Sequence, residues 1–175
     1  YEYANGIGET QITRMEPDNK GYSNSTTLAE DVTDADTAKM VLLSLCETVC
    51  ARLRKDGMKS GCIAVQITYR TFQNRSHQCT LPTLTNVTGE VTSIAFQLFD
   101  QMWDGNTPIR LLGVAAQKVT GDSVRQYNLF DMDKYEKMEK LDAAIDKIRG
   151  KYGETSITRA CFMKKEMPKG WRGQK

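Results

Sequence analysis

The chain has 175 residues, a length that fits one domain of ordinary size with short extensions. No apolar run approaches the roughly 20 residues that cross a bilayer and no segment resembles a signal peptide, so we expect a soluble, cytoplasmic protein without a membrane partner. The net charge of +2 neither indicates nor excludes nucleic acid, and the five cysteines lack the spacing of a disulfide-rich secreted protein.

The N-terminal segment, residues 1–19, predicts the end of a helix that Gly6 stops, followed by a polar tether containing Pro17. Because the sequence begins at Tyr1 and not at a methionine, we expect it to be a piece of a longer protein. Residues 20–28 (KGYSNSTTL) are rich in serine and threonine and predict an edge-type strand.

A helix is predicted next, ending at Asp56-Gly57. Thr33, Asp34 and Asp36 supply a cap and first-turn acids. Apolar residues then recur with the helical period at Ala38, Val41, Leu42, Leu45, Val49 and Leu53. The sequence therefore predicts a helix with one buried side.

Cys46 and Cys50 lie four residues apart, on one side of this predicted helix. They are either half of a metal site or two small apolar core residues. Since the chain has a single histidine, His77, the sequence favours the core. The acids between residues 31 and 36 fit a helix start better than a metal site, and we predict no bound metal.

Two strands, a second helix and a last strand follow. Residues 62–70 alternate, with Ile63, Val65, Ile67 and Tyr69 on one face. A turn at residues 72–75 leads to a strand over residues 76–81, which Pro82 is expected to close. We then predict a helix over residues 89–103 and a strand over residues 108–119, with a bulge at Gly113.

The predicted order is βαββαβ, an α+β fold whose four-stranded sheet has two helices on one face. The uncovered face should present hydroxyl, amide and guanidinium groups, from Ser23, Ser25, Thr27, Gln66, Thr68 and Arg70. Such a face suits a phosphate backbone, and a basic stretch over residues 51–80 that includes Arg70 and Arg75 points the same way. The alternative is an ordinary solvated face of an antiparallel sheet.

Beyond the last strand, Gln126 is followed after two residues by Leu129-Phe130, the pattern of a short peptide that binds a partner. An amphipathic helix is predicted within residues 132–153, with apolar residues at Tyr135, Met138, Leu141, Ala144, Ile145 and Ile148. This helix packs either on its own chain or in a partner's groove. Residues 154–175 form a basic tail that we expect to be partly disordered.

Four ordered motifs carry a resemblance to a known family: KGYSNSTTLAEDVTD, ITYRTFQNRSHQCTLP, LFDQMWDGNTPIRLLGV and QYNLFD. Together they resemble the C-terminal part of bacterial Y-family translesion DNA polymerases, of the DNA polymerase IV and UmuC-like branch. The resemblance implies a little finger domain at residues 20–120 with the βαββαβ order. It also implies the end of a thumb and a tether at residues 1–19, and a segment that binds the sliding clamp at residues 121–131.

The resemblance also implies site residues. Those matching DNA-binding positions, together with the basic residues noted above, are Lys20, Ser23, Ser25, Thr27, Arg70, Arg75 and Arg110. Those matching the clamp motif are Gln126, Leu129 and Phe130, with Tyr127 replacing a more usual leucine. Basic residues of some relatives are replaced here by Leu111 and Ala115, which implies a weaker electrostatic grip.

The function implied is DNA binding and sliding-clamp docking for an error-prone polymerase in translesion synthesis and DNA repair. A polymerase holds two Mg²⁺ ions with paired carboxylates, which in this family belong to a palm upstream of Tyr1. We therefore expect a monomer without cofactor that is inactive alone.

Two alternatives remain at this point. One is a stand-alone nucleic-acid-binding module with a ferredoxin-like fold, which would stack bases on exposed aromatic residues such as Tyr69 or Phe72. The other is an interaction domain that binds only through Leu129 and Phe130.

Overall fold

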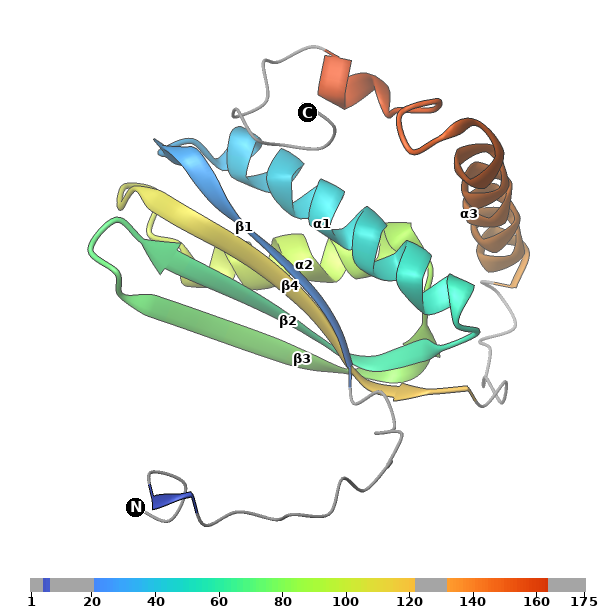
Figure 1. Ribbon diagram of the computed structural model, residues 1–175, viewed down its shortest axis with the longest axis horizontal. Coiled ribbons are helices and arrows are strands. Elements are labelled where there is room, and N and C mark those ends of the chain that lie inside the picture. Colours follow the sequence, from blue (N-terminus) through green and yellow to red (C-terminus); the bar gives the residue numbers. More distant parts are fainter. Residues whose placement is uncertain (1–4, 7–20, 122–131, 164–175) are drawn as a thin grey trace.

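The structure is a computed structural model that describes residues 5–6, 21–121 and 132–163 (Figure 1). The elements follow in the order β1 (Gly21–Val32), α1 (Ala35–Lys55), β2 (Lys59–Tyr69), β3 (Asn74–Thr85), α2 (Thr88–Met102), β4 (Ile109–Thr120) and α3 (Met132–Tyr152). A short 3-10 helix, Ala160–Met163, comes after α3. The predicted βαββαβ order and the additional helix are confirmed.

The four strands form an antiparallel sheet in the order β1-β4-β2-β3, so β1 and β3 are the edges. Helices α1 and α2 lie side by side on one face of this sheet (Figure 1). The core fills the space between the helices and the sheet, where Ile63, Val65 and Ile67 of β2 belong to one cluster with the apolar sides of α1 and α2. Each such aliphatic side chain contributes roughly 1.5–3 kcal/mol when fully buried.

Helix α1 begins and ends where the sequence predicts. The Asp34 carboxylate accepts a hydrogen bond from the backbone N–H of Thr37 at 2.8 Å, which caps the first turn. Gly57, with φ 67°, ends the helix. Cys46 and Cys50 are fully buried in the core, as predicted, and burial raises the pKa of the Cys46 thiol to about 12.

Two predictions about the strands are wrong. Pro82 does not close β3, which continues to Thr85. The strand is at the edge of the sheet, where a residue without an N–H is tolerated. Gly113 is not bulged but pairs regularly with Ser25 and Gln66. A Cβ at Gly113 would lie 3.2 Å from the Cβ of Ser25, so the glycine permits a close approach of neighbouring strands.

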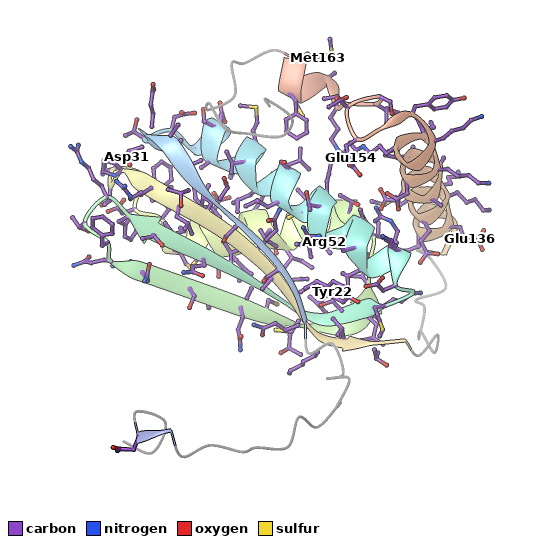
Figure 2. All side chains as sticks on the ribbon, viewed as in Figure 1. Tyr22, Asp31, Arg52, Glu136, Glu154 and Met163 are labelled. Carbon is purple, nitrogen blue, oxygen red and sulfur yellow. The ribbon has the colours of Figure 1, made fainter. Side chains whose placement is uncertain are left out.

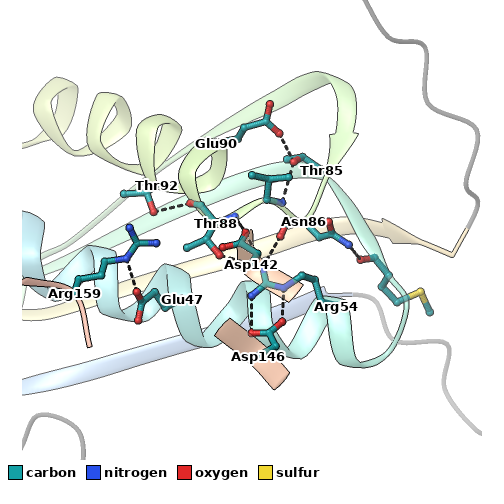
Figure 3. Close-up of polar contacts among 12 residues, drawn as sticks. Glu47, Arg54, Thr85, Asn86, Thr88, Glu90, Thr92, Asp142, Asp146 and Arg159 are labelled. Atoms are coloured by element: carbon teal, nitrogen blue, oxygen red, sulfur yellow. Dashed lines mark hydrogen bonds and ion pairs between the residues drawn. The ribbon is translucent and has the colours of Figure 1, made fainter. Parts of the chain in front are cut away.

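Helix α3 packs on its own chain, one of the two predicted possibilities, but only part of the apolar stripe takes part: Tyr135, Met138 and Ile145 are half-buried, and the Met138 side chain lies against Gly89 of α2. Leu141 and Ile148 of that stripe are 57% and 37% exposed. Asp142 and Arg149 are buried as well, and both form ion pairs with residues of α1; Asp142 is seen beside Arg54 in Figure 3. None of the helices described is both long and apolar enough to cross a membrane.

Candidate nucleic-acid interface

The sheet face turned away from α1 and α2, called here the open face, carries rows of short side chains that cross all four strands. One row is Ser25, Gly113, Gln66 and Ser76, and the next is Ser23, Ala115, Ala64 and Gln78. No helix among the described residues covers this face (Figure 1). The expectation that Ser23, Ser25, Thr27 and Gln66 share one exposed surface is met: all four are exposed.

The middle of the open face is recessed because the two central strands, β2 and β4, contribute its smallest side chains. Ala64, Gly113 and Ala115 lie between polar edges and line a hollow of about 480 Å³. Serine hydroxyls from β1 and β3 and glutamine amides from β2, β3 and β4 surround it. This arrangement offers many neutral hydrogen-bonding groups over a floor that a bulky, rod-shaped partner can approach.

Two arginines lie at the end of the sheet that carries the turn between β2 and β3, called here the turn end. The backbone N–H of Arg70 donates to the Pro108 carbonyl at 3.0 Å, which ties this turn to the start of β4. The Arg70 side chain is 73% exposed and its Nε lies 3.5 Å from an Asp31 carboxylate oxygen. Asp31 also marks this end of β1 in Figure 2. Part of the Arg70 charge is therefore balanced within the domain.

Arg110 belongs to the same end but has a different neighbour. Its guanidinium carbon lies 5.0 Å from the centre of the Phe72 ring, a cation–π contact. Phe72 is 70% exposed and has φ 62°. Arg110 has no paired residue in β1 or in β2. The pairing of β4 with β1 shifts between Thr27 and Val32, and its pairing with β2 shifts between Thr68 and Tyr69.

Arg75 does not join the other predicted DNA-binding residues. It is paired with Ile67, whose side chain is in the core. The Arg75 guanidinium lies 5.9 Å from the Tyr69 ring and donates to the Met102 carbonyl at 3.5 Å, on the helix side of the sheet. Tyr69 itself is only 4% exposed, so of the two aromatic residues considered for base stacking only Phe72 is accessible.

Lys118 is a cationic residue of the open face that the sequence did not indicate. Simple alternation along β4 would direct it to the helix side, with Ala116. Its backbone instead has φ 51°, and its ammonium group donates to the Thr80 hydroxyl at 3.3 Å, at the end of the sheet opposite Arg110. Ser76, Gln78 and Gln117 were also missed, because β3 and the end of β4 were not assigned to the open face.

Four of the predicted residues lie outside the part of the chain that the structure describes: Lys20, Gln126, Leu129 and Phe130. The described residues next to them are informative. Gly21 at the start of β1 pairs with Gln117 near the end of β4, so the chain enters and leaves the sheet at the same end. This is the end at which Lys118 lies, away from Arg70 and Arg110.

A second polar cluster lies between α1 and α3 (Figure 3). Glu47, Asp142 and Arg149 are buried in it, and Arg54 and Asp146 are half-buried. Arg54 donates to Asp146 at 2.6 Å, to Asp142 at 3.2 Å and to the Asn86 carbonyl at 2.9 Å. Burial by itself lowers the pKa of Arg54, but the bond to Asp146 and the charge of Asp142 outweigh it, so the pKa is raised. Arg54 therefore stays charged and holds α3 in place.

The same junction contains a buried carboxylate, Glu47, between two arginines. Arg149 of α3 donates to it at 3.1 Å and Arg159 at 2.5 Å. With their partners in place, these groups have few free hydrogen-bonding positions, so the cluster fits a structural role and not a ligand site. In the described part of the chain, no group of three or more His, Cys, Asp or Glu residues could hold a metal ion.

Comparison with known proteins gives consistent results. A family model described as the impB/mucB/samB family C-terminal domain matches residues 19–129. The chain is 38% identical over 166 residues to DNA polymerase IV of Clostridium acetobutylicum, covering 95% of this chain and 42% of that protein. It is 30% identical over 174 residues to DNA polymerase IV of Clostridium kluyveri, covering 94% and 43%.

Among solved structures, the chain is similar to one described as a complex of beta-clamp processivity factor and little finger domain of PolIV. The TM-score is 0.46 at 20% identity, with 62% of this chain and 97% of that chain covered. The chain spans about two fifths of the length of the two DNA polymerases IV that it matches.

Proposed function

The chain belongs to the impB/mucB/samB family and carries its C-terminal domain, and we propose that its open face binds the duplex of primer–template DNA through the phosphates. The observation that carries the proposal is the composition of that face. Neutral donors cross all four strands over a floor of glycine and alanine, and the cations lie at its two ends.

Phosphate contact is what such a surface can perform. Serine, threonine and glutamine side chains, together with arginine and lysine, make most contacts to DNA phosphates in protein–DNA complexes. Base readout calls for a helix or ribbon in the major groove that presents long bidentate side chains. The open face is a sheet with short side chains at its centre, and binding should therefore be independent of sequence.

The proposal is tested by measuring the affinity for a fluorescently labelled, mixed-sequence duplex at several salt concentrations. Arg110→Ala should weaken binding and reduce the slope of log K against log salt by about one unit. Arg75→Ala is the matched control, since it removes the same charge from the helix side of the sheet. Equal effects of the two substitutions, or strong discrimination between scrambled duplexes, would contradict the proposal.

We also propose that Gln126, Leu129 and Phe130 bind a sliding clamp. The support is the motif itself and its place in the sequence, a few residues beyond the last strand. A short peptide with two apolar anchors and an amide should bind in the micromolar range, about −8 kcal/mol. Replacing Leu129 and Phe130 together by alanine should abolish clamp binding and leave duplex affinity unchanged.

The matched control for the clamp is the double substitution of Leu141 and Ile148 by alanine. It removes two apolar side chains that are exposed on α3 and outside the motif. Titration of each protein against the clamp then distinguishes loss of the motif from loss of exposed apolar surface in general. Equal clamp affinity of the wild type and the Leu129/Phe130 variant would remove the motif from the proposal.

The remaining part of the proposal concerns the longer protein. The relatives are named DNA polymerase IV, and we infer a parent polymerase that acts in translesion synthesis and DNA repair. Its palm carboxylates would hold Mg²⁺ outside this chain, which should be inactive alone. Primer extension by the purified chain with Mg²⁺ and nucleotides would contradict this inference.

A stand-alone RNA-type module is disfavoured by one observation. Such modules stack bases on aromatic residues of the central strands, but Tyr69 is buried and Phe72 lies in a turn against Arg110. Preference for single-stranded RNA over duplex DNA would reverse this ranking.

A further inference from the structure

We propose that Phe72 is a positioning residue whose ring holds the Arg110 guanidinium ready for a DNA phosphate. The inference rests on the proposed function, because it deepens the role of the turn end of the open face. It adds a residue that carries no charge and has no hydrogen-bonding group in its side chain.

Phe72 occupies a position that disfavours a phenylalanine in two ways. The residue is 70% exposed, and its backbone has φ 62°, a conformation uncommon for residues other than glycine. Two hydrogen bonds hold the turn in this shape: the Phe72 N–H donates to the Tyr69 carbonyl at 2.9 Å, and the Tyr69 N–H donates to the Gln73 carbonyl at 2.9 Å. Glycine would suit this backbone better, so the benefit of the aromatic ring has to come from its contacts.

The described contact of the ring is with Arg110. The guanidinium carbon lies 5.0 Å from the ring centre, within the range of cation–π contacts. Such a contact uses the flat face of the guanidinium. The N–H donors of arginine lie in the plane of the group and remain available at its edge.

Arg70, the other arginine of the turn end, has a carboxylate as its neighbour in place of an aromatic ring. Its Nε lies 3.5 Å from an Asp31 oxygen, so a carboxylate competes with any phosphate for its charge. Among the described residues, Arg110 forms no such ion pair. The two arginines of the turn end therefore differ: the charge of Arg70 is partly neutralised by Asp31, whereas Arg110 is held by the Phe72 ring and no described carboxylate neutralises its charge.

The backbone contributes to the placement of Arg110. Register shifts on both sides of β4 leave this residue without a paired residue in β1 or in β2. Irregularities of this kind re-aim side chains at the ends of sheets. A side chain that is already held loses less conformational freedom on binding, which increases affinity without a new contact.

The experiment compares duplex affinities by fluorescence anisotropy with the same mixed-sequence duplex at fixed salt. Phe72→Leu keeps an apolar side chain but removes the ring, and it should weaken binding roughly two- to fivefold. Phe72→Tyr keeps the ring and should restore most of the affinity. In an Arg110→Ala background, Phe72→Leu should have no further effect, because its role acts through Arg110.

Tyr152→Leu provides the matched control. Tyr152 is 66% exposed, and the centre of its ring lies 5.0 Å from the Lys151 ammonium nitrogen. The substitution therefore removes a similar exposed cation–π contact on α3. It should leave duplex affinity unchanged. Phe72→Gly adds a second readout, since it should raise the melting temperature by relieving the positive φ and still weaken DNA binding.

The outcomes separate the inference from the proposed function. If Phe72→Leu weakens binding equally with and without Arg110, the ring contacts DNA directly and the positioning role is wrong. If Arg110→Ala weakens binding but Phe72→Leu does not, the inference alone fails. If Arg110→Ala has no effect on duplex affinity, the proposed role of the turn end fails, and the inference fails with it.

Discussion

In the middle of the open face the polar side chains are neutral and mostly exposed, whereas at the junction between α1 and α3 they are charged and largely buried. The open face presents serine and glutamine side chains around a floor of glycine and alanine. At the junction, Arg54 faces Asp142 and Asp146 (Figure 3), and Glu47 forms ion pairs with both Arg149 and Arg159. Both regions are polar, but only one leaves its hydrogen-bonding groups available to another molecule.

The difference follows from the cost of removing each kind of group from water. An ion that loses its hydration is expensive unless another ion and hydrogen bonds replace the water. The junction meets that condition within the chain and joins α3 to the domain. Removing neutral hydroxyls and amides from water costs less free energy, so a surface made of them can bind a partner reversibly.

The largest expected effect is on the junction. Asp142→Ala removes an acceptor from Arg54, at 3.2 Å, and from the backbone N–H of Thr88, at 2.8 Å. Breaking a buried pair by deleting one partner costs about 3 kcal/mol, so the free energy of unfolding should fall by about that amount. Urea denaturation measures it, and duplex affinity should be unchanged because the open face is not involved.

The control for this prediction is an ion pair of the same helix that is exposed. Lys140 lies 3.1 Å from Glu136, one turn away, and the two side chains are 77% and 57% exposed. Lys140→Ala should cost less than about 0.5 kcal/mol. If the two substitutions had similar effects on stability, the junction would not be the structural element inferred here.

The second prediction adds charge to the neutral region. Ala115 lies in the middle of the open face, between Ser23 and Ala64. Ala115→Lys should strengthen duplex binding and steepen the salt dependence by about one unit, and Ala115→Glu should weaken binding. Ala143→Lys, at an exposed position of α3, adds the same charge elsewhere and should change neither. Binding that responds equally to charge at both positions would mean that the open face is not the DNA surface.

The third prediction concerns the ion pair between Arg70 and Asp31 at the turn end. Asp31→Asn removes the carboxylate that lies 3.5 Å from Arg70 and should free this arginine for a phosphate. Duplex affinity should rise, with a salt slope steeper by up to about one unit. Asp100→Asn makes the same change of charge on α2, where the partner is Lys39, and should have little effect. A fall in affinity on Asp31→Asn would show that Asp31 positions Arg70 and does not neutralise it.

Periodicity and capping predicted most of the fold. The cap at Asp34, the apolar side of α1 and the alternation of β2 are local patterns. The cap appears in the structure as a hydrogen bond and the other two as burial patterns. Pro82 and Gly113 were misread because the sequence does not say which strand is an edge or where two strands approach closely. Those facts depend on strand order, which is a property of the whole sheet.

The site was harder to predict than the fold. Lys118 reaches the open face through a positive φ, and Arg110 falls between two register shifts, neither of which follows from alternation. The buried side of α3 depends on Arg54, which is 92 residues from Asp146 in sequence. A helix such as α3 has both apolar and charged side chains that could be buried, and the residues of α1 that it contacts determine which of them are.

The last prediction tests whether burial is needed to hold a charge firmly. Asp104 is exposed, yet it accepts hydrogen bonds from the Thr107 hydroxyl at 2.6 Å and from the backbone N–H groups of Thr107 and Asn106 at 2.8 and 3.0 Å. The Thr107 hydroxyl and these N–H groups lower the pKa of Asp104 to about 2. A lowered carboxyl pKa stabilises the fold above the unfolded value, near 4, and this contribution is lost as the pH falls through about 2.

Carbon-13 NMR of the Asp104 carboxyl should therefore show a titration midpoint near pH 2. Thr107→Val removes the hydroxyl and should move the midpoint upward, toward the ordinary aspartate value. The loop that Asp104 closes leads directly into β4, and Trp103 fixes its other side by donating to the Thr107 carbonyl at 2.9 Å. An unchanged midpoint in Thr107→Val would mean that the hydroxyl does not hold this carboxylate. A lowered midpoint that depends on Thr107 would instead show that donors fixed by a tight loop can hold an exposed charge, without the cation and the burial that the junction of α1 and α3 uses.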